Sequence, residues 1–503
     1  MIPVIKSNPD VTLIRMKRWS KIFFVCLVMS LTGGKASASE TDTLQLTLKQ
    51  CLDFALGSSP DLQLARLDSI ATESRWRSTS AKSYPQLKMQ LQAPDRSESV
   101  DYGITYDPAV QQEEYRKIEA GDTRWLSSLQ LEQALPWGAT LDFSTRLYRS
   151  TWHNDRIGSG GDTTEYSLRR SVYLDQPLFE GNPVGRSRKI GRLNRQEGLI
   201  DFELRRRQVR YRATLAFFGL VSARGELEIA ESGLEQARDA EELAQRKLKA
   251  GLIPEVELLQ IQVDLARREA SYRSNEDAVE KAEDQLRLVL GLPPVKKIEA
   301  IWEPQPIDED RNLTEDSGIE RLELAKERLN LEQAEIETRI AVLSERISTT
   351  LSVYYEIDIR RPEFADLEEA GDRNMGVVLN IDFPIFGFGS TSGRVEELRA
   401  NLRRSRLSYQ VTQAEHLNEM RDILRSIRQA ADRITIADAA LGLSERSYDI
   451  TADRFGSGLV DSRELLDAQI ELSRTRSDAL NARIDYHLAL ANLERISPQT
   501  IDE

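Results

Sequence analysis

The sequence contains few of the residue types on which catalytic and metal sites depend. Its 503 residues include three histidines and two cysteines. His153, His416 and His487 have no partner at a spacing that would create a metal or acid–base site. Gly-x-Gly-x-x-Gly, Walker and Gly-x-Ser-x-Gly motifs are also missing from the sequence. We therefore expect neither an enzyme nor a bound metal or cofactor.

Basic charge is also scarce. The formal net charge is −14, and residues 1–38 carry +5, so the rest of the chain carries −19. A nucleic-acid-binding protein needs a basic face to contact phosphates. We therefore expect no nucleic-acid partner.

The chain lacks a long apolar run. The most apolar segment, residues 22–31, is far shorter than the ~20 residues that a membrane-spanning helix needs. It follows a basic stretch and precedes small residues ending at Ala38, which is the order of a secretory signal. The sequence predicts a signal peptide over residues 1–38, cleaved after Ala38 and starting at either Met1 or Met16. A single membrane anchor is the alternative.

The two cysteines exclude a disulfide framework. Cys26 lies inside the apolar run of the signal, so Cys51 is the only cysteine expected after processing. No intrachain disulfide or thiol-rich metal site can then form. The sequence indicates an exported protein that does not depend on disulfides.

What the sequence does contain is a duplication. Residues 249–259 form a predicted helix end followed by a helix start, and a near copy lies 207 positions later. Gly251 and Leu252 correspond to Gly458 and Leu459 without a gap. Repeats of this length usually indicate one architecture built twice.

The duplication extends well beyond this turn. The same offset places Pro177 on Pro384, which predicts helices of equal length in both copies. The predicted divisions are the signal peptide (1–38), the first structural repeat (39–297), an acidic linker (298–318), the second structural repeat (319–497) and a short tail (498–503).

Alternating apolar and polar residues predict β-strands. They lie near residues 87–91, 129–135, 141–147 and 168–174 in the first repeat, and near 350–359 and 376–383 in the second. Residues 94–124 and 150–165 are polar and predict long loops. The alternation fits either a soluble sheet with one wet face or a membrane barrel with a wet lumen, and the strands alone leave both open.

Long amphipathic segments predict helices. They cover residues 47–83 with an interruption near Gly57, then 186–250, 255–290, 319–346, 393–455 and 461–496. Apolar residues at 3,4 spacing indicate coiled-coil packing. Glu241 lies on that seam, where a charge costs stability unless it faces water. An ordinary two-stranded coiled coil would not account for the strands.

The order of these elements resembles the TolC family of outer-membrane efflux channels, from residue 47 to residue 496. The resemblance is carried by Gln176-Pro177-Leu178-Phe179 and Phe383-Pro384-Ile385-Phe386, and by Ala250-Gly251-Leu252 and Ser457-Gly458-Leu459 at the tips. It implies that Pro177 and Pro384 mark the junctions between barrel and helix, since proline cannot donate to a strand ladder and tolerates the first helical turn. It implies a mainly α protein with membrane β, in which three protomers share one β-barrel continued by a long periplasmic α-helical barrel. The family usually has two strands in each repeat, whereas this sequence predicts four and two.

The resemblance also implies a channel constriction. Acidic residues of the family ring it at the start of the second return helix, and alignment on the tip places them at Glu464 and Asp467. Residues three apart on a helix can project toward one lumen, where carboxylates attract cations and hinder anions. Glu464 is equally well explained as a first-turn acid stabilised by the helix dipole, since Glu257 repeats it.

The two tips resemble the docking motif of the family for a periplasmic adaptor. The residues concerned are Gly251, Leu252, Gly458 and Leu459. A helix cap in which glycine adopts the left-handed turn explains each glycine but not the repeated leucine.

The expected function is that of an exit duct in the cell outer membrane, with a large periplasmic portion. It would passively conduct substrates for a tripartite efflux pump or a type I secretion system. The expected partners are two sister subunits in a homotrimer, the adaptor, an inner-membrane transporter of RND, ABC or similar type, and outer-membrane lipid. A periplasmic adaptor or structural coiled-coil protein of the envelope is the alternative.

Overall fold

The computed structural model describes residues 44–107, 111–154, 162–179, 181–293, 297–303, 321–344, 348–383, 385 and 388–496. The chain divides into two compact units. Among the described residues, the smaller comprises residues 44–45 and 297–299, and the larger comprises those within 46–293 and 300–496. In the smaller unit, the N–H of Leu44 donates to the carbonyl of Lys297 at 2.8 Å, where strand β1 (Leu44–Leu46) meets strand β6 (Ile298–Ala300).

The helices of the larger unit follow the predicted order. They are α2 (Leu48–Ser58), α3 (Pro60–Ala81), α4 (Pro183–Lys249), α5 (Glu255–Leu290), α6 (Leu322–Ser344), α7 (Ser390–Gly456) and α8 (Ser462–Ile496), with a 3-10 turn at Ala365–Glu368. Thr47 begins α2 through a capping box with Gln50. Ser59 separates α2 from α3, as the interruption predicted, but its side chain makes no capping bond and Pro60 starts the helix.

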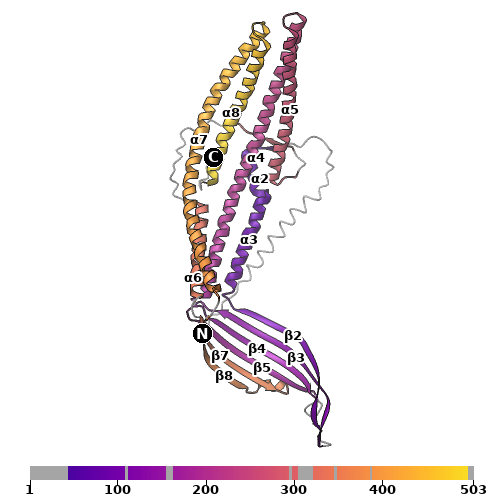
Figure 1. The fold of residues 1–503 in the computed structure, drawn as a ribbon, viewed down its shortest axis with the longest axis vertical. Helices are drawn as coiled ribbons and strands as arrows, with labels where there is room; N and C mark the ends of the chain where they lie inside the picture. The colour runs from indigo at the N-terminus through magenta and orange to yellow at the C-terminus, as the bar shows by residue number, and fades with distance from the viewer. Residues whose placement is uncertain are drawn as a thin grey trace, which may run out of the picture. The chain divides into compact units, whose positions relative to one another are not determined.

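The prediction of equal helix lengths in both copies is confirmed. Helices α4 and α7 each have 67 residues, and the return helices α5 and α8 have 36 and 35. Each long helix and its return helix form an antiparallel hairpin with a short turn (Figure 1). The residue borders assigned to the two repeats stay a prediction.

The strands form one antiparallel sheet in the order β2-β3-β4-β5-β7-β8 (Figure 1). They are β2 (Gln86–Asp107), β3 (Gln112–Ala134), β4 (Thr140–Asn154), β5 (Thr163–Pro177), β7 (Ser348–Arg361) and β8 (Asp372–Asp382). The first repeat contributes four of these strands and the second contributes two, as predicted. The two strands that the first repeat has beyond the family's usual number therefore widen the sheet.

The predicted loop over residues 94–124 is wrong. Most of it continues β2 and β3, which pair from Gln86 with Glu132 out to Asp107 with Gln112. The register shifts once, between Gln92 and Asp95, next to a proline that has no N–H to donate. Beyond that point Val100, Tyr102 and Ile104 of β2 still alternate with polar residues, but residues 112–119 of β3 show no such alternation, and Val100 is paired with Glu119.

The predicted loop over residues 150–165 is also shorter than expected. Strand β4 runs on to Asn154 and β5 begins at Thr163. Only the residues between these two strands remain as their connection.

The two faces of the sheet differ sharply in polarity. Directly paired residues share a face, and one such row crosses all six strands as Leu87, Leu131, Phe143, Val172, Tyr355 and Met375. A row on the opposite face reads Gln90, Ser128, Arg146, Arg169, Asp358 and Asp372. Arg169 pairs there with Asp358 at 3.1 Å. One face therefore suits lipid, and the other suits water.

The helices pack closely along their length. A Cβ added to Gly225 of α4 would lie 2.3 Å from Cδ2 of Leu480 on α8, so this glycine permits a close approach of the two helices. Phe217 and Phe218 are fully buried beside it. Among the helices of the described residues, none is long and apolar enough to cross a membrane.

Candidate channel constriction and docking tips

The first hairpin tip is a glycine-dependent helix cap. The N–H of Gly251 donates to the carbonyl of Leu248 at 2.9 Å, and the N–H of Leu252 donates to Lys247 at 2.9 Å. These two bonds are the Schellman pattern, which requires a left-handed residue at the glycine position. Gly251 has φ +71°, and an added Cβ would meet nothing within 4 Å. Backbone conformation alone therefore selects glycine here.

The second tip has the same geometry. The N–H of Gly458 donates to Phe455 at 3.0 Å, and the N–H of Leu459 donates to Arg454 at 2.9 Å. Gly458 has φ +76°, again with open space around it. The cap accounts for both glycines without any partner.

The leucines need a different explanation. Leu252 is 73% exposed and Leu459 is 69% exposed, so neither contributes to the packing of its own chain. Two large apolar side chains stand at equivalent places on two tips, each beside a glycine. Their role in docking an adaptor stays a prediction.

Glu464 and Asp467 lie on the first turns of α8 and are both exposed. The N–H of Glu464 donates to the side chain of Asp461 at 3.0 Å, so Asp461 provides the cap of this helix. Leu465 and Gln469 face the opposite way and are 3% and 2% exposed. Neither Glu464 nor Asp467 forms an ion pair among the described residues. Both carboxylates therefore point away from the packed side of α8, and their place at a constriction stays a prediction.

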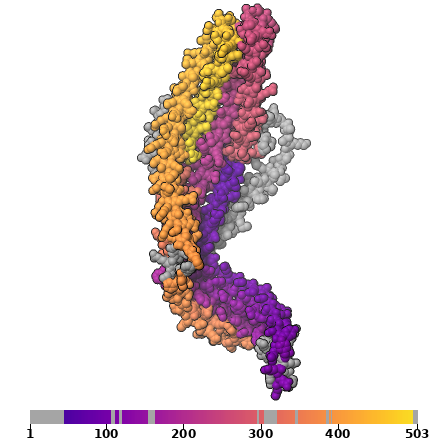
Figure 2. Space-filling model, in the orientation of Figure 1, coloured from indigo at the N-terminus to yellow at the C-terminus, as the bar shows by residue number. Residues whose placement is uncertain are grey.

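The two hairpins of one chain pack together near their tips (Figure 2). A buried cluster there joins residues of all four helices: Ala240, Ala244, Ile261, Phe455 and Leu465. Glu241, the charge predicted on the seam, is half-buried and accepts a hydrogen bond from Gln262 of α5 at 3.0 Å. That bond compensates the carboxylate for the water it loses.

Lys247 makes a contact with α7 that the sequence did not predict. Its side chain is 6% exposed, its ammonium donates to the carbonyl of Phe455, and it lies 4.0 Å from the centre of the Phe455 ring. Burial lowers the pKa of Lys247, and the carboxylate of Glu257 opposes that shift. The end of α4 is thereby tied to the end of α7. Lys247 follows the buried Ala240 and Ala244 at intervals of four and three, but a lysine is not expected on a buried helix face.

The sheet-to-helix junction differs in detail from the prediction. Pro177 is the last residue of β5 and pairs with Thr350, whereas α4 begins at Pro183. Asn182 caps that helix by accepting from the N–H of Gly185 at 2.8 Å, and its amide donates to the carbonyl of Pro136 at 2.5 Å. The first helical turn thus uses a later proline than the one predicted. Pro384 and Ala38 lie outside the described residues.

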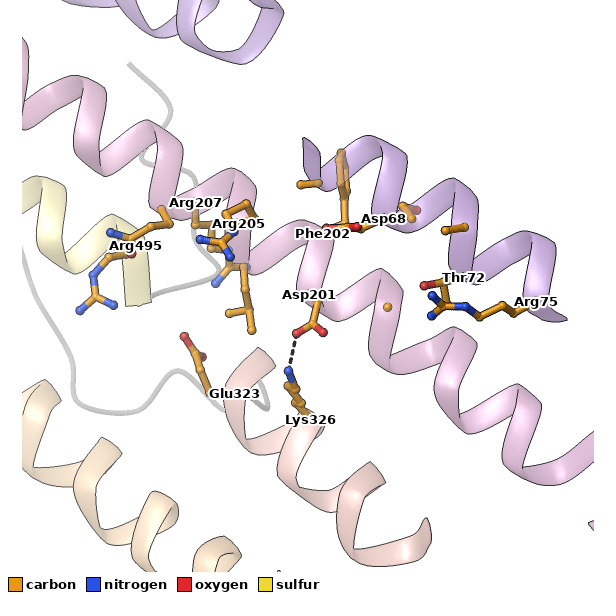
Figure 3. A pocket seen from close by; sticks show the side chains of 16 residues that line it. Asp68, Thr72, Arg75, Asp201, Phe202, Arg205, Arg207, Glu323, Lys326 and Arg495 are labelled. Carbon is orange, nitrogen blue, oxygen red and sulfur yellow. Dashed lines mark hydrogen bonds and ion pairs between the residues drawn. The ribbon is translucent and has the colours of Figure 1, made fainter. Parts of the chain in front are cut away.

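A cleft of about 570 Å³ lies between α3, α4, α6 and α8 (Figure 3). Lys326 and Asp201 face each other in it at 2.6 Å. Burial acts to lower the pKa of Lys326, but the hydrogen bond and charge of Asp201 outweigh it and the pKa is raised. One oxygen of Glu323 is buried without a hydrogen-bond partner in the described structure. Because its lining mixes both signs of charge, the cleft does not single out a substrate.

The histidines belong to the packing of the helices. His487 stacks on Phe218 at 5.4 Å between ring centres, and Trp302 packs edge-on against it at 5.6 Å. His416 contacts Arg321 at 3.1 Å. The side chain of His153 lies outside the described residues. In the part of the chain that the structure describes, no group of three His, Cys, Asp or Glu side chains could hold a metal.

The family of the chain follows from a comparison with family models. The model for outer membrane efflux proteins matches residues 131–292 and 317–497, which is more than half of the chain and spans both hairpins. The chain belongs to the outer membrane efflux protein family. No curated protein is similar enough in sequence to count as a match.

Solved structures show the same fold. The outer membrane protein VceC of Vibrio cholerae has 17% identity and a TM-score of 0.65, over 89% of this chain and 95% of that one. The CmeC outer membrane channel of Campylobacter jejuni has 15% identity and a TM-score of 0.64, over 92% and 89%. CusC has 17% identity and a TM-score of 0.64, over 92% and 94%.

Family and fold together assign the general activity. The predicted fold class, a β-barrel domain continued by a helical barrel, is that of the similar structures. The protein is an outer-membrane efflux channel, as predicted, and the adaptor alternative is not supported. Its family is one of channels and not of enzymes.

Proposed function

We propose that three copies of this chain assemble into the exit duct of a tripartite efflux pump or type I secretion system. In this role the chain conducts substrates passively, and an inner-membrane transporter of RND, ABC or similar type supplies the energy. The helices lie in the periplasm, after export with residues 1–38 as a signal cleaved behind Ala38.

The observation that carries the assembly is the pair of open sheet edges. Within the described residues, strands β2 and β8 each pair on one side only. An open edge cannot face lipid, because its N–H and C=O groups would have no partners. Since neighbouring strands alternate in direction, β8 of one copy meets β2 of the next in antiparallel orientation.

The polarity of the two edges is compatible with that pairing. Leu87 and Met89 of β2 lie on the same face of the sheet as Leu379 and Ile381 of β8, according to the paired rows. Three chains of six strands give a barrel of eighteen. Barrels of 16–18 strands enclose an aqueous channel, which a duct for bulky or hydrated solutes requires.

The gate lies at the other end of the protein. In a trimer, three copies of Asp467 and Glu464 surround one axis, where up to six carboxylates repel one another and attract cations. Leu252 and Leu459 lie at the ends of the same hairpins and form the contact surface for the periplasmic adaptor.

Two measurements test the assembly. Native mass spectrometry of the detergent-extracted protein should give the mass of three chains, and imaging of that particle should show one barrel of eighteen strands. A monomer that stays dissolved in detergent-free buffer would refute the proposal.

The gate has its own test. Asp467→Asn should weaken the block of single-channel current by a trivalent cation and reduce cation selectivity. Glu257→Gln is the matched control, because Glu257 occupies the place of Glu464 in the first repeat. Unchanged block and selectivity in Asp467→Asn would remove Asp467 from the constriction.

A further inference from the structure

A row of aromatic and basic residues crosses the apolar face of the sheet. Trp125, Arg149, Tyr166 and Arg361 are directly paired across β3, β4, β5 and β7, so their side chains share one face. This face is the one that carries Phe143, because side chains alternate along a strand. Cations therefore stand on the side of the sheet that suits lipid.

The row lies where the membrane should end. Arg149 follows Thr140, the first residue of β4, by nine positions. At about 3.3 Å per residue and a tilt of ~45°, nine residues rise about 21 Å. The apolar band of a membrane barrel is ~25 Å tall, so the row falls at the border that is distant from the helices.

The opposite border is also aromatic. Exposed rings stand near the helix-side ends of the strands, namely Tyr84, Trp137, Phe179 and Phe383. Paired aromatic girdles mark the two interfaces of membrane barrels.

Two further arginines lie deeper on the same face. Arg170 pairs with Thr145 and with Ile357, and Arg373 pairs with the same Ile357 from the other side. Both arginines are exposed on the apolar face, one strand apart from each other, or ~10 Å between their backbones. They lie two rows closer to the middle of the band than Arg149. An arginine at this depth bends toward the interface to keep its charge hydrated.

These cations have little compensation from their own chain. The guanidinium of Arg149 lies 5.9 Å from the ring centre of Tyr166, and Phe364 packs edge-on against that ring at 5.7 Å. Arg361 is paired with Glu369 at 3.3 Å. Arg149 and Arg170 form no ion pair among the described residues. Arg149 thus stands beside an aromatic ring at the lipid border, and neither Arg149 nor Arg170 has a carboxylate partner among the described residues.

We infer that this border is a binding site for the phosphate groups of lipid headgroups in the leaflet distant from the helices. Arg149, Arg170 and Arg373 supply the charge, and Trp125 and Tyr166 hold the adjoining acyl and sugar parts of the lipid. Guanidinium groups bind phosphate through two parallel hydrogen bonds, and aromatic rings are favoured at the same depth. The site continues directly into the apolar band, which favours a lipid over a soluble anion.

The test uses the full-length protein in nanodiscs of phosphatidylcholine that contain either bisphosphorylated lipid A or the same glycolipid without its phosphates. Native mass spectrometry counts the glycolipid that each particle retains after dilution. Wild-type protein should retain the phosphorylated form at least tenfold more strongly. Arg149→Gln combined with Arg170→Gln should remove most of that preference.

Arg146→Gln is the matched control. Arg146 lies on β4 between Thr145 and Leu147, is exposed, and faces the other side of the sheet. It should leave the preference unchanged, and all variants should keep the oligomeric mass of the wild type. Equal retention of both glycolipids by the wild type, or an equal loss in Arg146→Gln, would overturn the inference. Displacement of the lipid by millimolar inorganic phosphate would also overturn it, because the site would then take a soluble anion.

Discussion

Replacing both tip leucines should weaken adaptor binding without weakening the fold. The perturbation is Leu252→Gln together with Leu459→Gln. Their side chains are 73% and 69% exposed, so their loss should change folding stability by less than about 0.5 kcal/mol. Gly251 and Gly458 remain, and with them both helix caps.

The expected loss of binding free energy follows from the exposed fractions of the same two side chains. Burying a whole leucine side chain contributes about 2 kcal/mol, and roughly 70% of each side chain remains to be buried, so each tip contributes about 1.4 kcal/mol. That amount corresponds to about tenfold in Kd per tip, and about a hundredfold if one partner uses both. The adaptor encoded beside this channel provides the binding partner, and a strain lacking its own copy of the channel provides the efflux assay.

The control is Leu288→Gln. Leu288 is 77% exposed on the same hairpin as Leu252, but it lies at the other end of α5. Its replacement should alter neither Kd nor efflux. Unchanged binding in the double variant, or an equal loss in Leu288→Gln, would contradict a docking role for the tips.

Three further predictions concern the helices. Burial lowers the pKa of His487 below 6.5, so just below pH 6.5 the unfolded chain binds more protons than the folded chain. The free energy of unfolding should therefore fall as the pH drops through that window. Thermal melting of His487→Phe should not show this dependence on pH. Burial raises the pKa of the Cys51 thiol to about 12, so iodoacetamide at pH 8 should modify it only after denaturation, and labelling of the folded protein would contradict this. Gly291→Ala should lower the free energy of unfolding by about 2 kcal/mol or more, because φ is +69° and the new Cβ would lie 2.8 Å from the carbonyl oxygen of Ser58. Gly251→Ala, with φ +71° and open space, should lower it by only about 1 kcal/mol. Denaturant titration of both variants measures the difference.

Periodicity and duplication made most of the fold predictable from the sequence. The predicted helix over residues 255–290 agrees with α5 to the residue, and the one over 393–455 falls within α7 (Ser390–Gly456). A 3,4 pattern sustained over dozens of residues outweighs local propensity. The constant offset between the copies then predicted each element of one copy from its counterpart in the other.

The hairpin of β2 and β3 was not predictable in the same way. Residues 100–107 and 112–119 pair only with each other, outside the reach of β4. Val100, Tyr102 and Ile104 alternate with polar residues on β2, but residues 112–119 of β3 show no such alternation. Only one of the two strands therefore carries a period of two, and the pairing of backbone groups supplies the other.

The site was predictable only where it repeats. Gly251 and Gly458 were recognisable because each copy confirms the other, and their caps have the predicted geometry. Lys247 was not recognisable, since its partner is a backbone carbonyl on another helix, 208 positions away. A contact to a main-chain atom does not depend on the type of the partner residue, so the sequence does not indicate it.

The β2–β3 hairpin runs on past its neighbours as an isolated ribbon (Figure 1). On the proposed topology, with the helices in the periplasm, this ribbon is the portion of the protein that phages, antibodies and proteases in the surroundings encounter first. Nothing else in the described sheet relies on its hydrogen bonds. It should therefore accept an inserted epitope near residue 112. A protease added outside the cell should cleave the ribbon and leave the channel intact.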